Sequence, residues 1–143
     1  REVADNLVAG QEVLWETERF ERLIEFSDLA IESMENRQVR RYVDDMLRLK
    51  GRAQYQLGRY QEARATLTRG CDLAQQYESK RNLWPMLDLL GRVEQALGNE
   101  AHGAELRGQA RRIVREIAEA AGRPEIREGF LGLPQVRELM LGA

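Results

Sequence analysis

Landmarks in the chain recur at a constant interval of 40 residues, and this repeat limits the fold more than any other feature of the sequence. The aligned landmarks are Arg19-Phe20 with Arg59-Tyr60, Gly51 with Gly91, and Leu57-Gly58 with Leu97-Gly98. A period shared by independent landmarks is typical of arrays in which similar units stack on one another. The same interval aligns Leu7, Leu47 and Leu87 as one buried column, and Trp15, Tyr55 and Gln95 as another.

The apolar residues within the units lie at helical spacing. Between Phe20 and Met34, and again between Tyr60 and Tyr77, apolar or small side chains recur three or four residues apart, which places them on one face of a helix. Gly58 and Gly98 follow helical segments, where glycine ends a helix because it adopts the left-handed backbone conformation without steric cost. No stretch alternates apolar and polar residues with a period of two, so we expect no sheet.

The second and third units resemble the tetratricopeptide repeat, in which small residues let the two helices of a hairpin approach closely. The residues that carry the resemblance are Leu47, Gly51, Gly58, Tyr60, Ala63, Leu67 and Gly70 in the second unit and Leu87, Leu90, Gly91, Gly98, Gly103 and Ala110 in the third. In the first unit Gln11 replaces the glycine and Leu23 replaces the small residue, so we expect its helices to pack further apart. The 40-residue length exceeds the common repeat of about 34 and is similar to the C-terminal repeat regions of bacterial signalling ATPases and transcriptional regulators.

We therefore expect an all-α fold, a right-handed superhelical solenoid of three helix hairpins with C-terminal capping helices. The hairpins occupy residues 1–121, at about 3–36, 43–78 and 83–121, and the cap occupies 122–143. The first helices of the hairpins are expected near 3–16, 43–57 and 83–97, and the second near 19–36, 60–78 and 100–121.

The C-terminal segment contains two prolines that predict two short helices. Pro124 suits the first turn of a helix, where its missing N–H is not needed, and Pro134 separates a final short helix from the one before it. The apolar content of the segment predicts a lid on the last hairpin, since a terminal repeat must cover its apolar face. A helix that detaches and docks elsewhere in a longer protein is the alternative. We expect such a longer protein because Arg1 already lies inside a helical pattern.

Composition excludes several classes of function. Lys and Arg total 22 against 24 Asp and Glu, for a net charge of −2, so nucleic-acid binding is not expected, since it needs a basic excess. No apolar run approaches the roughly 20 residues of a membrane span and no leader is present, which predicts a cytoplasmic protein without a membrane partner. Cys71 is the only cysteine and His102 the only histidine, too few for a zinc site or for a nucleophile held by a base. We assign no catalytic residue, metal or cofactor, and do not expect an enzyme.

The repeat places a row of charged and aromatic residues on the concave surface that the first helices would line. The row contains Asp5, Val8, Glu12 and Trp15, then Asp45, Arg48, Arg52 and Tyr55, then Asp88, Arg92 and Gln95. The candidate partner-binding residues are Glu12, Trp15, Arg48, Arg52, Tyr55, Asp88 and Arg92. Arginine binds carboxylates with two hydrogen bonds and aromatic rings add apolar contact, so the row would suit an acidic or C-terminal peptide.

The same residues allow a purely structural interpretation. Glu12 is placed to pair with Arg52, and Arg48 is placed to reach Asp45 or Asp88, so the cluster could neutralise itself. Trp15 and Tyr55 could be ordinary packing residues of their helices.

Two arginine-rich stretches remain. Arg107, Arg111, Arg112 and Arg115 share one side of a helix and are interleaved with glutamates, which predicts a solvated face, with a phosphate-binding strip as the alternative. The basic turn at 37–41 also contains three arginines and allows the same two interpretations, a solvated surface or a phosphate-binding site.

The resemblance implies a protein-interaction module, expected to be the regulatory or sensory region of a larger bacterial signalling or transcription-regulating protein. Its partner would be another protein or another domain of the same chain. The alternative is a homo-oligomerisation module that uses the convex face or the C-terminal helix.

Overall fold

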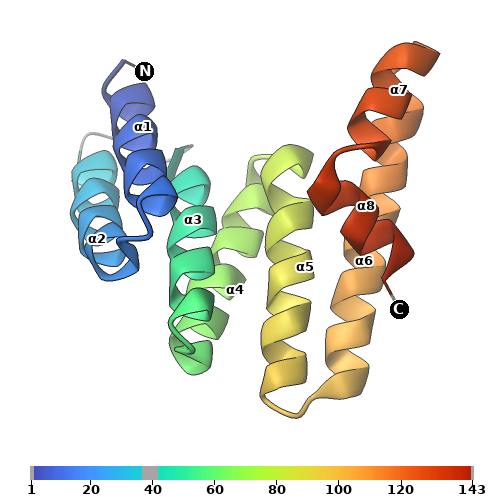
Figure 1. The fold of residues 1–143 in the computed structure, drawn as a ribbon. Coiled ribbons are helices and arrows are strands. Elements are labelled where there is room, and N and C mark those ends of the chain that lie inside the picture. Colours follow the sequence, from blue (N-terminus) through green and yellow to red (C-terminus); the bar gives the residue numbers. More distant parts are fainter. Residues whose placement is uncertain (1, 37–41, 143) are drawn as a thin grey trace.

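The fold is all-α, as the sequence predicts. A computed structural model describes residues 2–36 and 42–142, and the basic turn at 37–41 lies outside these ranges. The described residues form eight helices and no strand (Figure 1). The helices are α1 (Glu2–Glu16), α2 (Phe20–Asn36), α3 (Val43–Gln56), α4 (Tyr60–Gln76), α5 (Lys80–Ala96), α6 (Glu100–Ala120), α7 (Pro124–Leu131) and α8 (Pro134–Leu141).

The helix limits agree with the predicted ones to within three residues, and the largest difference is at α5. This helix begins at Lys80, before the expected start, and therefore contains Pro85. It begins early because the carbonyl of Ser79 accepts hydrogen bonds from the backbone N–H groups of Asn82 and Leu83. The prolines of the C-terminal segment stand in the first turns of α7 and α8, as expected.

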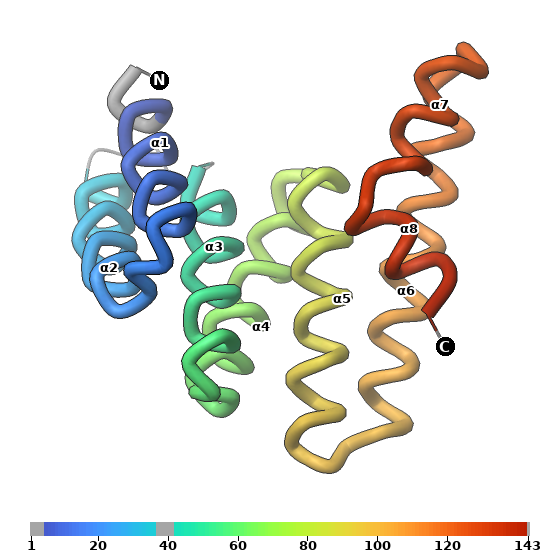
Figure 2. Tube along the Cα trace, viewed as in Figure 1, coloured from blue at the N-terminus to red at the C-terminus, as the bar shows by residue number. Residues whose placement is uncertain are grey.

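The first six helices are arranged in two rows. Consecutive helices run antiparallel and contact each other, and α1, α3 and α5 also contact one another in sequence (Figures 1 and 2). The three turns that follow this row of helices share one backbone feature at the 40-residue interval. Glu18, Gly58 and Gly98 all have left-handed φ values, of 56°, 74° and 92°. The repeat is therefore present in the backbone even where the first turn lacks the glycine.

Two glycines let α5 and α6 touch through their backbones. A Cβ atom added to Gly103 would stand 2.5 Å from the carbonyl oxygen of Gly91, and one added to Gly91 would stand 2.7 Å from that of Gly103. In the first pair of helices, Gln11 occupies the place of Gly91. Its buried amide donates to Ser27 Oγ at 2.9 Å and to the Met46 carbonyl at 2.7 Å. A hydrogen-bonded side chain thus stands where the third pair has bare backbone.

The last helix covers the end of the α5–α6 pair. Val136 and Leu139 of α8 are fully buried in the same core as Trp84 of α5. Arg111 of α6 donates from Nε to the Leu139 carbonyl at 2.9 Å and from Nη2 to the Gly142 carbonyl at 2.8 Å. These bonds supply partners for carbonyls that the end of a helix leaves free. The C-terminal segment therefore covers the apolar end of α5 and α6, as expected.

The predicted solvated arginine face of α6 is wrong for two of its four members. Arg107 is buried and its Nε lies 3.0 Å from Asp88 Oδ1, while Arg111 is partly buried under α8. Arg112 and Arg115 are exposed, as predicted. Arg107 faces α5 and Arg111 faces α8, so tertiary packing separates these two arginines from Arg112 and Arg115.

We predict that Gly103→Ala lowers the free energy of unfolding by about 1–3 kcal/mol, because the added methyl group overlaps the backbone of α5. Gly108→Ala in the same helix is the control, since a Cβ there meets nothing within 4 Å. It should raise the free energy of unfolding by about 0.5–1 kcal/mol through helix propensity. Urea unfolding of both variants measures the difference, and equal effects would show that the two helices do not touch at this point.

We predict that Arg111→Met increases amide hydrogen exchange in α8, because the last carbonyls lose their charged donor. Arg112→Met, one position along and exposed, should leave the exchange of α8 unchanged. Hydrogen–deuterium exchange read by mass spectrometry compares the two variants. Faster exchange in both, or in neither, would contradict the anchoring role of Arg111.

Candidate functional site

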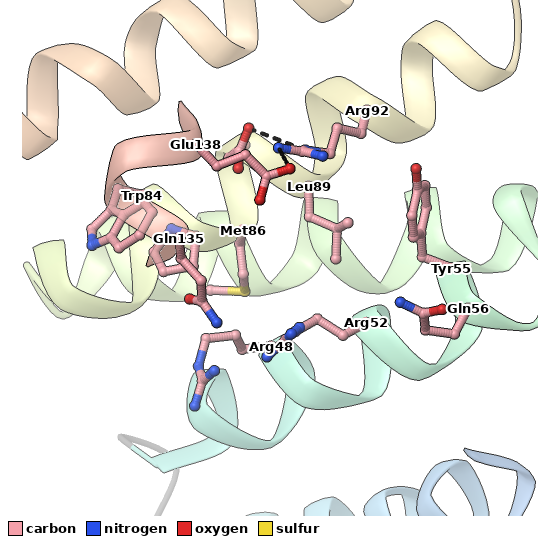
Figure 3. A pocket seen from close by; sticks show the side chains of 12 residues that line it. Arg48, Arg52, Tyr55, Gln56, Trp84, Met86, Leu89, Arg92, Gln135 and Glu138 are labelled. Carbon is pink, nitrogen blue, oxygen red and sulfur yellow. Dashed lines mark hydrogen bonds and ion pairs between the residues drawn. The ribbon is translucent and has the colours of Figure 1, made fainter. Parts of the chain in front are cut away.

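A groove with a volume of about 270 Å³ lies between α3, α5 and α8 (Figure 3). Its lining consists of Arg48, Arg52, Tyr55 and Gln56 from α3, of Trp84, Pro85, Met86, Asp88, Leu89 and Arg92 from α5, and of Gln135 and Glu138 from α8. The charged groups come from all three helices, and the apolar ones mostly from α5. The groove therefore presents charged walls and an apolar floor.

Five of the seven candidate residues line this groove, namely Arg48, Arg52, Tyr55, Asp88 and Arg92. Trp15 is outside the lining but touches it, since the Arg52 guanidinium lies over the Trp15 ring at 4.1 Å from its centroid. Glu12 is exposed and also outside the lining; its charge acts on Arg48 without an ion pair. The remaining residues of the predicted row, Asp5, Val8, Asp45 and Gln95, are not part of the groove.

Arg92 is neutralised by two carboxylates within the groove. Its Nε lies 3.5 Å from Asp88 Oδ1 on the same helix, and its Nη2 lies 3.2 Å from Glu138 Oε1 on α8 (Figure 3). Burial acts to lower the pKa of Arg92, but the charges of Asp88 and Glu138 outweigh it and leave the pKa raised. For this arginine, the self-neutralising interpretation is confirmed.

Arg48 and Arg52 are different, because neither makes an ion pair or a hydrogen bond with any residue in the described part of the chain. Burial lowers the pKa of both, and the charge of Arg48 lowers that of Arg52 further. The pairings that would have neutralised them are not formed. Asp88 pairs with Arg92 and Arg107, while Asp45 pairs with Arg81. Arg48 and Arg52 thus face the groove without an ion pair among the described residues. The charges of Asp45 and Glu12 act on Arg48 without a direct contact, and an anionic group from outside would supply a direct partner.

The floor of the groove offers apolar contact beside this charge. Trp84 and Met86 are buried, and Leu89 is half-buried between them and Arg92. Tyr55 closes one end, with its ring 5.5 Å from that of Tyr60. Because Met86 has no exposed surface, a side chain that enters between the walls would meet Leu89 and the ring of Tyr55.

Sequence reasoning missed the lining residues of α8 and several of α5. Met86 could have been found, because the 40-residue interval aligns it with Met46, and both are fully buried. Gln135 and Glu138 follow the last unit, so no interval aligns them with anything. Their place depends on how α8 folds back over α5.

A second polar cluster joins the beginnings of α3 and α5 below the groove. Asp44 and Asn82 are each 1% exposed, and Asn82 Nδ2 donates to Asp44 Oδ2 at 3.1 Å and to Asp45 Oδ1 at 2.9 Å. Within the described residues, Asp44 Oδ1 and Asn82 Oδ1 have no hydrogen-bond partner. Burial raises the pKa of Asp44, and the bond from Asn82 opposes this only in part. Burial therefore makes the ionised form of Asp44 unfavourable at the place where α3 and α5, two walls of the groove, contact each other.

The other candidate residues lie away from the groove. His102 is exposed in the first turn of α6, as expected, and Cys71 is buried, as expected. Burial raises the pKa of the Cys71 thiol to about 12, so it remains protonated at neutral pH. No group of three or more potential metal ligands occurs in the ranges 2–36 and 42–142. None of the helices described above is both long and apolar enough to cross a membrane.

Comparison of the chain with protein-family models, curated proteins and solved structures finds no match. The function must therefore be argued from the groove and its chemistry.

We predict that Asp44→Asn stabilises the protein more at pH 7 than at pH 4. A raised pKa means that the folded state binds a proton more readily than the unfolded state, whose Asp titrates near 3.8. The stabilisation that this proton provides is present below that value and is lost as the pH rises through the pKa of folded Asp44. The asparagine variant cannot ionise, so it escapes this loss.

Urea unfolding at the two pH values measures the effect as a difference between Asp44→Asn and the unmodified chain. Asp72→Asn, which removes an exposed carboxylate from α4, controls for the loss of one negative charge. A difference that does not grow with pH would show that burial does not penalise the ionised form of Asp44.

Proposed function

We propose that the chain is a protein-interaction module that binds a segment of another protein, or of another domain of its own parent protein, in the groove between α3, α5 and α8. The bound segment would carry an acidic side chain next to an apolar one. The observation that carries this proposal is the pair of arginines, Arg48 and Arg52, that face the groove without an ion pair among the described residues.

The physical argument rests on the cost of leaving these cations partly desolvated. Burial of a charge without a partner is unfavourable, and the penalty is recovered when a carboxylate forms charge-assisted hydrogen bonds with it. A solvent anion would satisfy the charge alone. A protein segment with an acidic and an apolar side chain would also contact Leu89, so it would use both features of the groove.

We further infer that the helices form a right-handed tetratricopeptide-type solenoid of three hairpins with a cap. The two rows of helices, the left-handed residue at the same place in three turns and the glycine contact of α5 with α6 support this inference. Arrays of this kind bind other proteins through an extended preformed surface. The similarity of the repeat length to bacterial regulators supports a regulatory or sensory role in the cytoplasm, as part of a larger signalling or transcription-regulating protein.

Self-association is the second candidate, because the C-terminal segment exposes three large apolar side chains. Ile126, Leu133 and Leu141 are 55%, 51% and 78% exposed. A second copy of the chain would remove this apolar surface from water. Light scattering at increasing protein concentration distinguishes this role, since a peptide-binding monomer keeps a constant mass.

The test of the proposed function is selection from a displayed library of random peptides on the unmodified chain and on two double variants. Arg48→Gln/Arg52→Gln removes the unpaired charges, and Arg112→Gln/Arg115→Gln removes the same charge from the exposed face of α6. We expect acidic-apolar peptides that bind the groove variant at least about tenfold more weakly, a loss of about 1.4 kcal/mol. The control variant should bind them as the unmodified chain does. Equal binding by all three proteins, or a concentration-independent dimer that selects no peptide, would overturn the proposal.

A further inference from the structure

We propose that Glu138 of α8 determines the specificity of the groove by occupying its third arginine, so that the groove accepts a segment with one acidic position and disfavours a run of acidic residues. This inference rests on the proposed function and adds to it the charge pattern of the partner. It follows from three observations: how α8 is held, how charge is divided between the walls, and which α8 side chains face the groove.

The carboxylate of Glu138 is not what holds α8 in place. Val136 and Leu139 are fully buried, and Arg111 binds the carbonyls of Leu139 and Gly142. The side chain of Glu138 is 65% exposed, and within the described residues its carboxylate pairs with Arg92. An exposed ion pair of this kind contributes little to stability. Its effect is therefore on the charge of the groove rather than on the position of the helix.

The walls of the groove differ in charge. On the α3 wall Arg48 and Arg52 have no ion pair with any described residue, whereas on the opposite side Arg92 is paired with Asp88 and Glu138. A carboxylate of a bound segment is therefore attracted to the α3 wall alone. A second carboxylate placed near Arg92 would meet Glu138, and like charges brought together reduce affinity.

The choice of residues on α8 agrees with this division. Gln135 and Glu138 lie one helical turn apart and both line the groove. In Figure 3 the Gln135 side chain extends toward Arg48 and Arg52, while Glu138 reaches Arg92. The residue that points at the unpaired arginines is thus a neutral amide, and the carboxylate stands one turn away. A carboxylate at position 135 should therefore compete with a bound segment for Arg48 and Arg52, and an amide at position 138 should no longer compete for Arg92.

Two variants and two peptides test the proposal. Glu138→Gln leaves Arg92 with Asp88, which it shares with Arg107, and Gln135→Glu places an internal carboxylate beside Arg48 and Arg52. Glu128→Gln, exposed on α7, controls for the loss of one negative charge. The probes are the capped peptides Ac-SAELAS-NH₂, with one carboxylate, and Ac-SAELAE-NH₂, with two. Nuclear magnetic resonance titration follows the Nε–H signals of the arginines and measures weak affinities directly.

In the unmodified chain and in Glu128→Gln, we expect both peptides to shift Arg48 and Arg52, and the diacidic peptide to bind at least about twofold more weakly than the monoacidic one. In Glu138→Gln the diacidic peptide should bind at least about fivefold more tightly than the monoacidic one and should also shift Arg92. In Gln135→Glu both peptides should bind at least about fivefold more weakly than to the unmodified chain.

The proposal is overturned if the ratio of the two affinities is the same in Glu138→Gln as in the unmodified chain while both peptides still bind at Arg48 and Arg52. That result leaves the proposed function standing. If neither peptide shifts the arginines in any of the proteins, recognition of acidic segments by this groove fails, and the role of Glu138 fails with it.

Discussion

The close approach of α5 and α6 at Gly91 and Gly103 is the contact on which the geometry of the groove depends. Because backbone meets backbone there, the two helices have little freedom to slide or rotate against each other. This fixes the face that α5 turns toward α3, and with it the positions of Asp88 and Arg92. It also fixes the surface of α6 on which α8 rests, so the third wall of the groove depends on the same pair of glycines.

Ion pairs connect α5 with α6 and α8, whereas two arginines of α3 at the groove form none within the described residues. Arg107, Arg92 and Asp88 form a continuous set of ion pairs between α5, α6 and α8. Arg48 and Arg52 lie only one helix away and have no such partner in the parts of the chain that the structure describes. A folded protein gains nothing from keeping two neighbouring cations partly desolvated, and Arg52 is steadied only by the ring of Trp15. This difference between Arg92 and its neighbours on α3 is the reason that the groove is proposed as a binding site.

Features that repeat could be predicted from the sequence, and features that occur once could not. The helix limits, the cap prolines and five groove residues follow from helical periodicity and from the 40-residue interval, because each unit obeys the same local rules. The role of α8 does not follow, since Gln135 and Glu138 have no counterpart in an earlier unit. The arginines of α6 show the same limit. Arg107 and Arg112 have similar local surroundings in sequence, and only tertiary packing buries Arg107 against Asp88 of α5 and leaves Arg112 in water.

The placement of the aromatic residues gives the molecule an optical property. The chain contains two tryptophans, and both are at the groove: Trp84 lines it, and Trp15 lies beneath the guanidinium of Arg52. Indole emission depends on the polarity and charge around the ring, so the tryptophan fluorescence of this protein originates from two rings at one surface. A molecule that binds beside Arg52 changes the surroundings of Trp15, and its binding is visible without a label.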